Sequence, residues 1–150
     1  MLYIGSDHAG FRLKEYIKKY FAENNILFKD LGVHTQESSD YPVISKKLCC
    51  EVLKDQNNKG ILICGTGIGV CIAANKIKGI RAALCSDSFL AEMCRKHNNA
   101  NVLCIGAKVL DNDKSVDIVN NFLSADFEGG RHSRRVDQIT EIEKYIEKTI

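Results

Sequence analysis

Short apolar runs, separated by stretches with helical periodicity, constrain the fold of this 150-residue chain more than any other feature. Four runs are apolar at consecutive positions: LYIG from Leu2, GILIC ending at Cys64, IRAALC ending at Cys85 and VLCIG from Val102. Consecutive apolar residues indicate strands buried on both faces, as in a parallel sheet covered by helices. A weaker run from Ile26 to Leu31 contains Lys29 and Asp30, so we expect it at an edge of the sheet.

Amphipathic helices are predicted between these runs, because apolar residues recur there at intervals of three and four. The repeating positions are Leu13, Tyr16, Ile17 and Tyr20, then Ile44, Leu48 and Val52, then Leu90, Met93, Cys94 and His97. Two later helices would present Ile118, Val119, Phe122 and Leu123, and then Ile139, Ile142 and Ile146. The alternation predicts an α/β fold with a parallel sheet of about five strands and helices on both faces. The length suits a single domain over residues 1–150.

Composition excludes several classes of protein. The formal net charge is +2, and the basic residues are scattered among acidic ones, so neither nucleic acid nor a membrane surface is expected as a partner. The chain starts MLYIGSDHAG without a basic leader, and no segment is apolar over a bilayer's width, so we expect a cytoplasmic protein. Its seven cysteines form no CxxC pair, which argues against a disulfide framework or a structural zinc site.

Ligands of open parallel sheets bind beyond the carboxyl ends of the strands. The residues that follow the apolar runs are therefore the first candidates for a site. They are Ser6, Asp7 and His8, the loop Gly65–Gly69, Ser86 and Asp87, and Gly106–Lys108. Asp7 could equally cap the helix that starts near Ala9.

The most informative stretch is CGTGIGVCIAANK, in which a strand ends at Cys64 and alternating glycines lead into a helix. The glycines could simply form a tight turn. A dinucleotide-binding loop would need a glycine where Val70 stands, a cysteine-dependent phosphatase would need an arginine after the glycines, and a P-loop would need GK followed by Ser or Thr. The remaining hypothesis is that loop N–H groups stabilise a transient anion while Cys64 moves a proton, since a helix N-terminus favours a thiolate.

Two polar clusters in the second half of the chain leave alternatives open. His97 could be a histidine packed at the edge of the core, but its neighbours Asn98 and Asn99 favour a site in which it transfers protons. The run FEGGRHSRRV could present a solvated basic face, or its arginines could bind a phosphate.

Five motifs taken together are similar to the ribose-5-phosphate isomerase B family, which includes allose- and galactose-phosphate isomerases. They are SDHAG, DYP at Asp40–Pro42, CGTGIG followed by IAANK, HNNAN, and EGGRHSRRV, and they cover Gly5 to about Val136. The resemblance implies a three-layer, Rossmann-like or flavodoxin-like domain. It also implies a homodimer or dimer of dimers with the active site shared between subunits, and no metal or other cofactor.

The resemblance also implies residue roles. Cys64 would be the base that moves a proton between carbons 1 and 2 of the sugar, and His97 would act in ring opening, assisted by Asp7 and Thr66. The substrate would contact Asp7, His8, Tyr41, Gly65, Thr66, Gly67, Ile68, Gly69, Asn98, Lys108, Arg131 and Arg135.

Two positions depart from patterns within the family. Some members have a glutamate base where Val70 stands, which leaves Cys64 as the candidate, with Cys71 as the only substitute thiol. Lys108 occupies a position where many relatives have an arginine. The expected reaction is the reversible isomerisation of ribose 5-phosphate and ribulose 5-phosphate through a cis-enediolate. The alternatives are a six-carbon allose or galactose phosphate isomerase, and a sugar-phosphate sensor without catalysis.

Overall fold

The structure, a computed structural model, describes the backbone of residues 1–149 and the side chains of residues 1–145. Within this range the strands are β1 (Leu2–Ser6), β2 (Phe28–Asp30), β3 (Lys59–Cys64), β4 (Ala82–Leu84) and β5 (Val102–Gly106). They form one five-stranded sheet in the order β2-β1-β3-β5-β4, and each neighbouring pair is parallel. The predicted sheet is confirmed, and the run containing Lys29 and Asp30 does lie at an edge.

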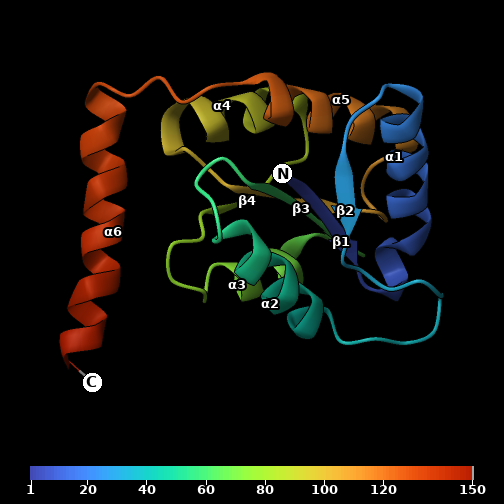
Figure 1. Ribbon diagram of the computed structural model, residues 1–150, viewed down its shortest axis with the longest axis horizontal. Coiled ribbons are helices and arrows are strands. Elements are labelled where there is room, and N and C mark those ends of the chain that lie inside the picture. Colours follow the sequence, from blue (N-terminus) through green and yellow to red (C-terminus); the bar gives the residue numbers. More distant parts are fainter. Residues whose placement is uncertain (150) are drawn as a thin grey trace.

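Helices cover both faces of this sheet (Figure 1). Helices α1 (Phe11–Glu23), α4 (Ser88–Asn98) and α5 (Asn112–Ser124) bury their apolar residues against one face. Helices α2 (Tyr41–Val52) and α3 (Ile68–Ala74) pack on the other. A short 3-10 helix, η1 (His8–Gly10), precedes α1. The predicted three-layer α/β architecture is therefore confirmed.

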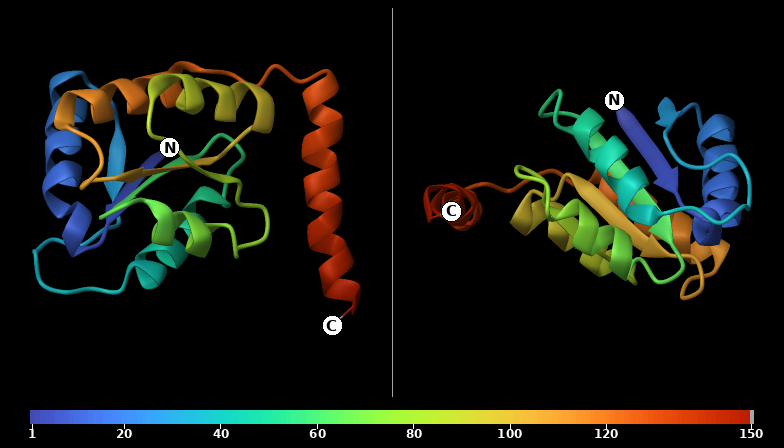
Figure 2. Two further views of the ribbon diagram at one scale, coloured as in Figure 1. Left: turned by 180° about the vertical axis from the view of Figure 1, so that it is seen from behind. Right: turned by 90° about the horizontal axis from the view of Figure 1, so that it is seen from below.

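The last helix, α6 (Arg131–Thr149), stands beside the three layers rather than over the sheet (Figure 2). Its predicted apolar residues Ile139 and Ile142 are 42% and 59% exposed, so they do not enter the core of this chain. The side chain of Ile146 lies outside the described residues. Among the described residues, neither this helix nor any other is long and apolar enough to cross a membrane.

Strand order determines where a ligand can bind. The chain leaves β1 through α1 on one face to reach β2, and then returns through α2 on the other face to reach β3. Because the two connections diverge between β1 and β3, we expect a ligand beyond the carboxyl ends of these two strands. Asp7 follows β1 directly, and Cys64 is the last residue of β3.

Candidate active site

Backbone hydrogen bonds bring together the segments that follow β1, β3 and β5. Asp7 N–H donates to the Ile63 carbonyl at 3.3 Å, Ala107 N–H to the Cys64 carbonyl at 2.9 Å, and Lys108 N–H to the Gly65 carbonyl at 2.8 Å. The convergence of these three segments at the carboxyl end of the sheet is confirmed.

Cys64 lies at the floor of this region, with its side chain on the α2 and α3 face of the sheet. The residue is only 5% exposed, and its Sγ accepts a hydrogen bond from Gly67 N–H at 3.2 Å. This bond holds the sulfur at the N-terminus of α3. The next amide, Ile68 N–H, donates to Thr66 Oγ1 at 3.3 Å, so Thr66 also helps to set the loop conformation.

Gly67 is the residue that gives the loop its shape. It has a φ of +79° and caps the N-terminus of α3. A Cβ at this position would lie 2.5 Å from Leu84 Cδ1 and 2.9 Å from the Ile105 carbonyl carbon. Only glycine tolerates both this backbone conformation and this close approach. The close packing of Gly67 against Leu84 and Ile105 keeps its N–H directed at the Cys64 sulfur.

Asp7 and His8 lie beside this loop and have defined partners. Asp7 is buried, and its Oδ1 accepts from Gly10 N–H at 3.0 Å, so the predicted capping role is confirmed. The exposed His8 exchanges two bonds with Ser39: its N–H donates to Ser39 Oγ at 3.1 Å, and its Nδ1 accepts from Ser39 N–H at 3.2 Å. Sequence reasoning missed Ser39, although it stands in the polar stretch before Pro42. Because Nδ1 is an acceptor here, a neutral His8 presents a donating Nε2.

Tyr41 and Lys108 complete the rim of this region. The Tyr41 ring packs directly over Gly69, where an added Cβ would lie 2.7 Å from Tyr41 Cζ. Tyr41 is 39% exposed and Lys108 is exposed, so both side chains can reach a ligand above the loop. The predicted position of Tyr41 at the cleft is consistent with this packing.

A cavity of about 350 Å³ adjoins the loop on the side of β4. It is lined by Thr66, Ile68, Leu84, Ser86, Gly106 and Val109, among others, and Cys64 is not one of its lining residues. The Cys64 sulfur therefore does not open into this cavity.

The other predicted site residues lie far from Cys64 within one chain. His97 and Asn98 end α4, and Asn101, just beyond them, bonds to Gly60 and Arg81 at the starts of β3 and β4. They therefore lie at the amino end of the sheet, whereas Cys64 lies at the carboxyl end. Arg131 and Arg135 are exposed on α6, which begins next to His97. One chain does not bring the predicted base and the predicted ring-opening acid together.

His97 has two neighbours that sequence reasoning did not assign. Its ring stacks on His132 of α6, with centroids 4.3 Å apart and planes 9° apart. Glu128 Oε2 lies 3.9 Å from His97 Nε2 and 3.7 Å from His132 Nε2. Glu128 and His132 are four residues apart, and this spacing was the sequence signal that could have predicted their contact. These atoms could approach a metal ion, but the near-parallel rings direct their lone pairs side by side rather than to one point.

Cys71 requires attention because it is the substitute thiol. It lies in α3 and is half-buried, and a hydrogen bond with the fully buried Cys104 lowers the pKa of Cys71 to about 7. Its Sγ lies 3.5 Å from the Ala82 carbonyl and 3.6 Å from Asn75 Nδ2. Cys71 thus contacts β4 and the end of α3.

Comparisons with known proteins identify the family. A model of the ribose/galactose isomerase family matches residues 2–139. The chain is 43% identical to ribose-5-phosphate isomerase B of Escherichia coli K12 over 140 residues, which are 93% of this chain and 94% of the relative. It superposes on ribose-5-phosphate isomerase B of Clostridium thermocellum with a TM-score of 0.94 and 46% identity, over 97% of this chain and 98% of that one.

A second solved relative carries a ligand. Ribose-5-phosphate isomerase B of Mycoplasma genitalium, determined with bound ribulose-5-phosphate, matches with a TM-score of 0.91 and 43% identity over 95% of both chains. The family predicted from the five motifs is thus confirmed. By the match of nearly its whole length in both sequence and fold, this chain belongs to the ribose/galactose isomerase family.

Proposed function

We propose that the chain interconverts ribose 5-phosphate and ribulose 5-phosphate. The observation that carries the proposal is the thiol of Cys64 beside the N-terminal amides of α3, at the carboxyl end of the sheet. Relatives with this fold are named for the same reaction, and one holds ribulose 5-phosphate. The identities of about 43% over nearly the full length favour this substrate over the six-carbon alternatives and over a sensor.

The reaction requires a proton to move between two carbons of the open-chain sugar. The Cys64 thiolate removes the proton from carbon 2 of ribose 5-phosphate, and the resulting negative charge passes to the oxygen on carbon 1. The thiol then returns the proton to carbon 1, while the carbon-2 hydroxyl passes its proton to the oxygen on carbon 1, so that carbon 2 becomes the ketone and carbon 1 carries a hydroxyl. The enzyme regains its thiolate, so no other reactant is consumed.

Loop amides stabilise the cis-enediolate between these two proton transfers. One well-aimed donor in such a site lowers the barrier by roughly 2.7–4 kcal/mol. Gly67 N–H already donates to Cys64 and Ile68 N–H to Thr66. The remaining amides of the segment Gly65–Gly69 are therefore the better candidates for the oxyanion.

A second copy of the chain completes the site. The partner's His97 opens the sugar ring, with Asp7 and Thr66 of this chain beside it, and the partner's Asn98 binds sugar hydroxyls. His8 and Lys108 meet the phosphate together with the partner's Arg131 and Arg135. The separation of His97 from Cys64 within one chain supports this arrangement, and so do the exposed Ile139 and Ile142, which suit an interface between copies. The assembly is a homodimer or a dimer of dimers.

A substrate panel tests the proposed function. Purified protein is assayed with ribose 5-phosphate, allose 6-phosphate and galactose 6-phosphate, each with and without a chelator of divalent ions. The highest kcat/KM is expected for ribose 5-phosphate, and the chelator should not change it. Faster turnover of either six-carbon substrate would overturn the substrate assignment, and binding without turnover of any of the three would overturn the enzyme.

A further inference from the structure

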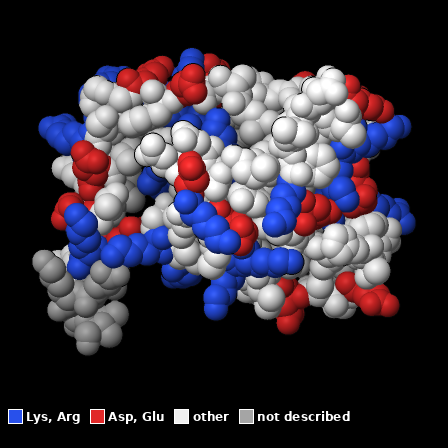
Figure 3. Space-filling view, in the orientation of Figure 1, with Lys and Arg blue, Asp and Glu red and all other residues white. Residues whose placement is uncertain are grey.

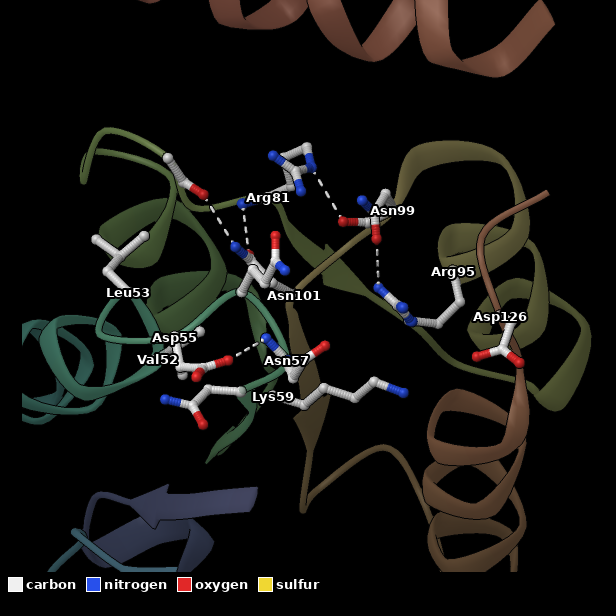
Figure 4. A pocket seen from close by; sticks show the side chains of 13 residues that line it. Val52, Leu53, Asp55, Asn57, Lys59, Arg81, Arg95, Asn99, Asn101 and Asp126 are labelled. Carbon is white, nitrogen blue, oxygen red and sulfur yellow. Dashed lines mark hydrogen bonds between the residues drawn. The ribbon is translucent and has the colours of Figure 1, made fainter. Parts of the chain in front are cut away.

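A second cavity, of about 600 Å³, lies at the opposite end of the sheet from Cys64. It opens beyond the amino ends of β3, β4 and β5, and lysine and arginine atoms are visible inside the hollow on this face of the molecule (Figure 3). Figure 4 shows its lining, which includes Lys59, Arg81, Arg95, Asn99, Asn101 and Asp126. We refer to it as the amino-end pocket. The proposed isomerase mechanism makes no use of it.

Arg95 is the most unusual residue of the pocket. It is only 8% exposed, and its Nη1 donates to Asn99 Oδ1 at 2.9 Å and to the Ala100 carbonyl at 2.6 Å. Its Nε–H is buried and has no hydrogen-bond partner among the described residues. An unpaired buried donor on a charged group is costly, so an acceptor at this position would stabilise the structure.

Lys59 lies next to Arg95 at the start of β3. The Lys59 Nζ and the Arg95 Cζ lie 6.0 Å and 5.9 Å from the centroid of the same Phe122 ring. Lys59 is half-buried and donates to the Leu123 carbonyl at 3.2 Å. Burial, and then the positive charge of Arg95, lower the pKa of Lys59. The positive charges of Lys59 and Arg95 are therefore close enough to repel each other.

Arg81 supplies the third positive charge, from the residue before β4. Its Nε donates to the carbonyls of Asn98 and Asn99, at 3.2 and 3.0 Å, and burial lowers its pKa. These two carbonyls at the end of α4 thus satisfy the Nε–H of the guanidinium. A guanidinium has five N–H donors, and to described residues the side chain of Arg81 donates through Nε alone.

The carboxylates that line the pocket do not neutralise these charges, and Glu143, outside the lining, acts on Arg81 only through its longer-range charge. Asp55 and Asp126 are the carboxylates that line the pocket, and both are exposed. Asp55 accepts from Asn57 N–H at 2.8 Å, and Asp126 acts on Lys59 and Arg95 only through its longer-range charge. Among the described residues, no ion pair within 4.0 Å joins either carboxylate to Lys59, Arg81 or Arg95. The inner part of the pocket thus carries an excess of positive charge.

We propose that the amino-end pocket binds a phosphate group, either as inorganic phosphate or as the ester of a small metabolite, through Lys59, Arg81 and Arg95. A tetrahedral dianion accepts hydrogen bonds from several directions, which suits three cations from three different elements better than a flat carboxylate does. The volume exceeds that of phosphate alone, and the exposed side-chain amide of Asn57 offers a partner for the rest of an ester.

Calorimetric titration of the full chain with inorganic phosphate tests the proposal. The variant is Lys59→Gln/Arg81→Gln, and the matched control is Lys54→Gln/Lys76→Gln, which removes the same charge from exposed residues outside the pocket. We expect wild type and control to bind one more equivalent per chain than the variant, or the variant to bind that equivalent at least about tenfold more weakly. Equal stoichiometry and affinity in variant and control would overturn the proposal.

Glycerol 3-phosphate serves as a second probe and distinguishes the two sources of the phosphate group. Tighter binding of the ester than of inorganic phosphate, lost in the Lys59→Gln/Arg81→Gln variant, identifies a phosphorylated metabolite as the occupant. If glycerol 3-phosphate binds no more tightly than inorganic phosphate, and the variant loses the binding of both, free phosphate is identified as the occupant. The isomerase assay of each variant is a separate measurement, so failure of this inference leaves the proposed function untouched.

A labelling experiment on the wild-type protein does not depend on the folding of a variant. The rate of reductive methylation of each lysine is followed by mass spectrometry, with phosphate or with chloride at the same ionic strength. Phosphate in the pocket should slow methylation of Lys59 severalfold and leave Lys54 unchanged. Equal rates at Lys59 in the two salts would contradict the proposal.

Discussion

Cys64 differs from Cys49 and Cys104 in its hydrogen bond and in its exposure. Burial raises the pKa of Cys49 to about 12, and it also raises the pKa of Cys104 well above its usual value. Cys49 and Cys104 are fully buried, whereas Cys64 is 5% exposed and accepts from Gly67 N–H at the start of α3. This contact makes it the cysteine best placed to act as the base.

Replacement of Cys64 by alanine should reduce kcat by a factor of about 10²–10⁴, because the variant has no group to carry the proton. Turnover of ribose 5-phosphate is the measurement. Cys71→Ser is the control: a hydrogen bond with Cys104 lowers the pKa of Cys71 to about 7, but the residue contacts β4, so its loss should change kcat less than about threefold. Full activity in Cys64→Ala would show that Cys64 is not the base. Loss of activity in Cys71→Ser alone would show that Cys71 is the base instead.

His132 should make stability depend on pH. Burial, and then the neighbouring His97, lower the pKa of His132 below its usual 6.5. The unfolded chain then binds a proton more readily than the folded one, so stability is lost as the pH falls below about 6.5. The thermal midpoint of the wild type should fall over this range, and His132→Gln should flatten the fall. The exposed His34 gives the control, since His34→Gln should keep the wild-type slope; an unchanged slope in His132→Gln would refute the prediction.

Residues close in sequence were the easiest to interpret. The cap by Asp7 and the loop after Cys64 were predictable because strand, turn and helix follow one another directly. The pairs His8 with Ser39 and His97 with His132 join different segments of the chain, so local patterns could not reveal them. The roles of these side chains in the reaction remain predictions.

At the scale of elements, a buried ion pair links α1 to the edge strand β2. Lys14 is fully buried, and its Nζ lies 2.6 Å from both Asp30 Oδ2 and the Val33 carbonyl. Lys14 precedes the buried Ile17 and Phe21 by three and seven residues, so it stands on the buried face of α1, and the loop after β2 brings the Val33 carbonyl to its Nζ. Burial opposes ionisation of Asp30, but hydrogen bonds from Lys14 and Lys18 outweigh it and lower its pKa.

Asp30→Asn should lower the free energy of unfolding by about 3 kcal/mol, because it leaves the buried charge of Lys14 with only the more exposed Glu15, whose Oε1 lies 3.3 Å away. The wild type gains this stability above the unfolded pKa of about 3.9 and loses it as the pH falls through the lower folded value. The variant should therefore lose less stability than wild type below about pH 4. Urea unfolding at several pH values is the measurement.

The exposed pair of Glu51 and Lys54 provides the control for this prediction. Glu51→Gln should cost less than about 1 kcal/mol, since surface ion pairs contribute little. If the Asp30 and Glu51 variants lose equal stability, the buried pair has no special importance.

At the scale of the whole molecule, the parallel sheet could be predicted because each strand and helix carries its own apolar pattern. Helix α6 shows the limit of this reasoning. Its repeat of Ile139 and Ile142 predicted a helix correctly, but a repeat does not say what covers it. The distance between Cys64 and His97 depends on strand order and on the placement of α4, which the motifs alone do not give.

Mixing two inactive variants tests the shared active site most directly. Cys64→Ala and His97→Asn subunits are each assayed alone and then after unfolding and refolding together. If the site combines Cys64 of one subunit with His97 of another, random pairing makes half of the dimers mixed, and each mixed dimer has one complete site. The mixture should then recover about a quarter of wild-type turnover of ribose 5-phosphate. A mixture no more active than either variant alone would contradict the shared site.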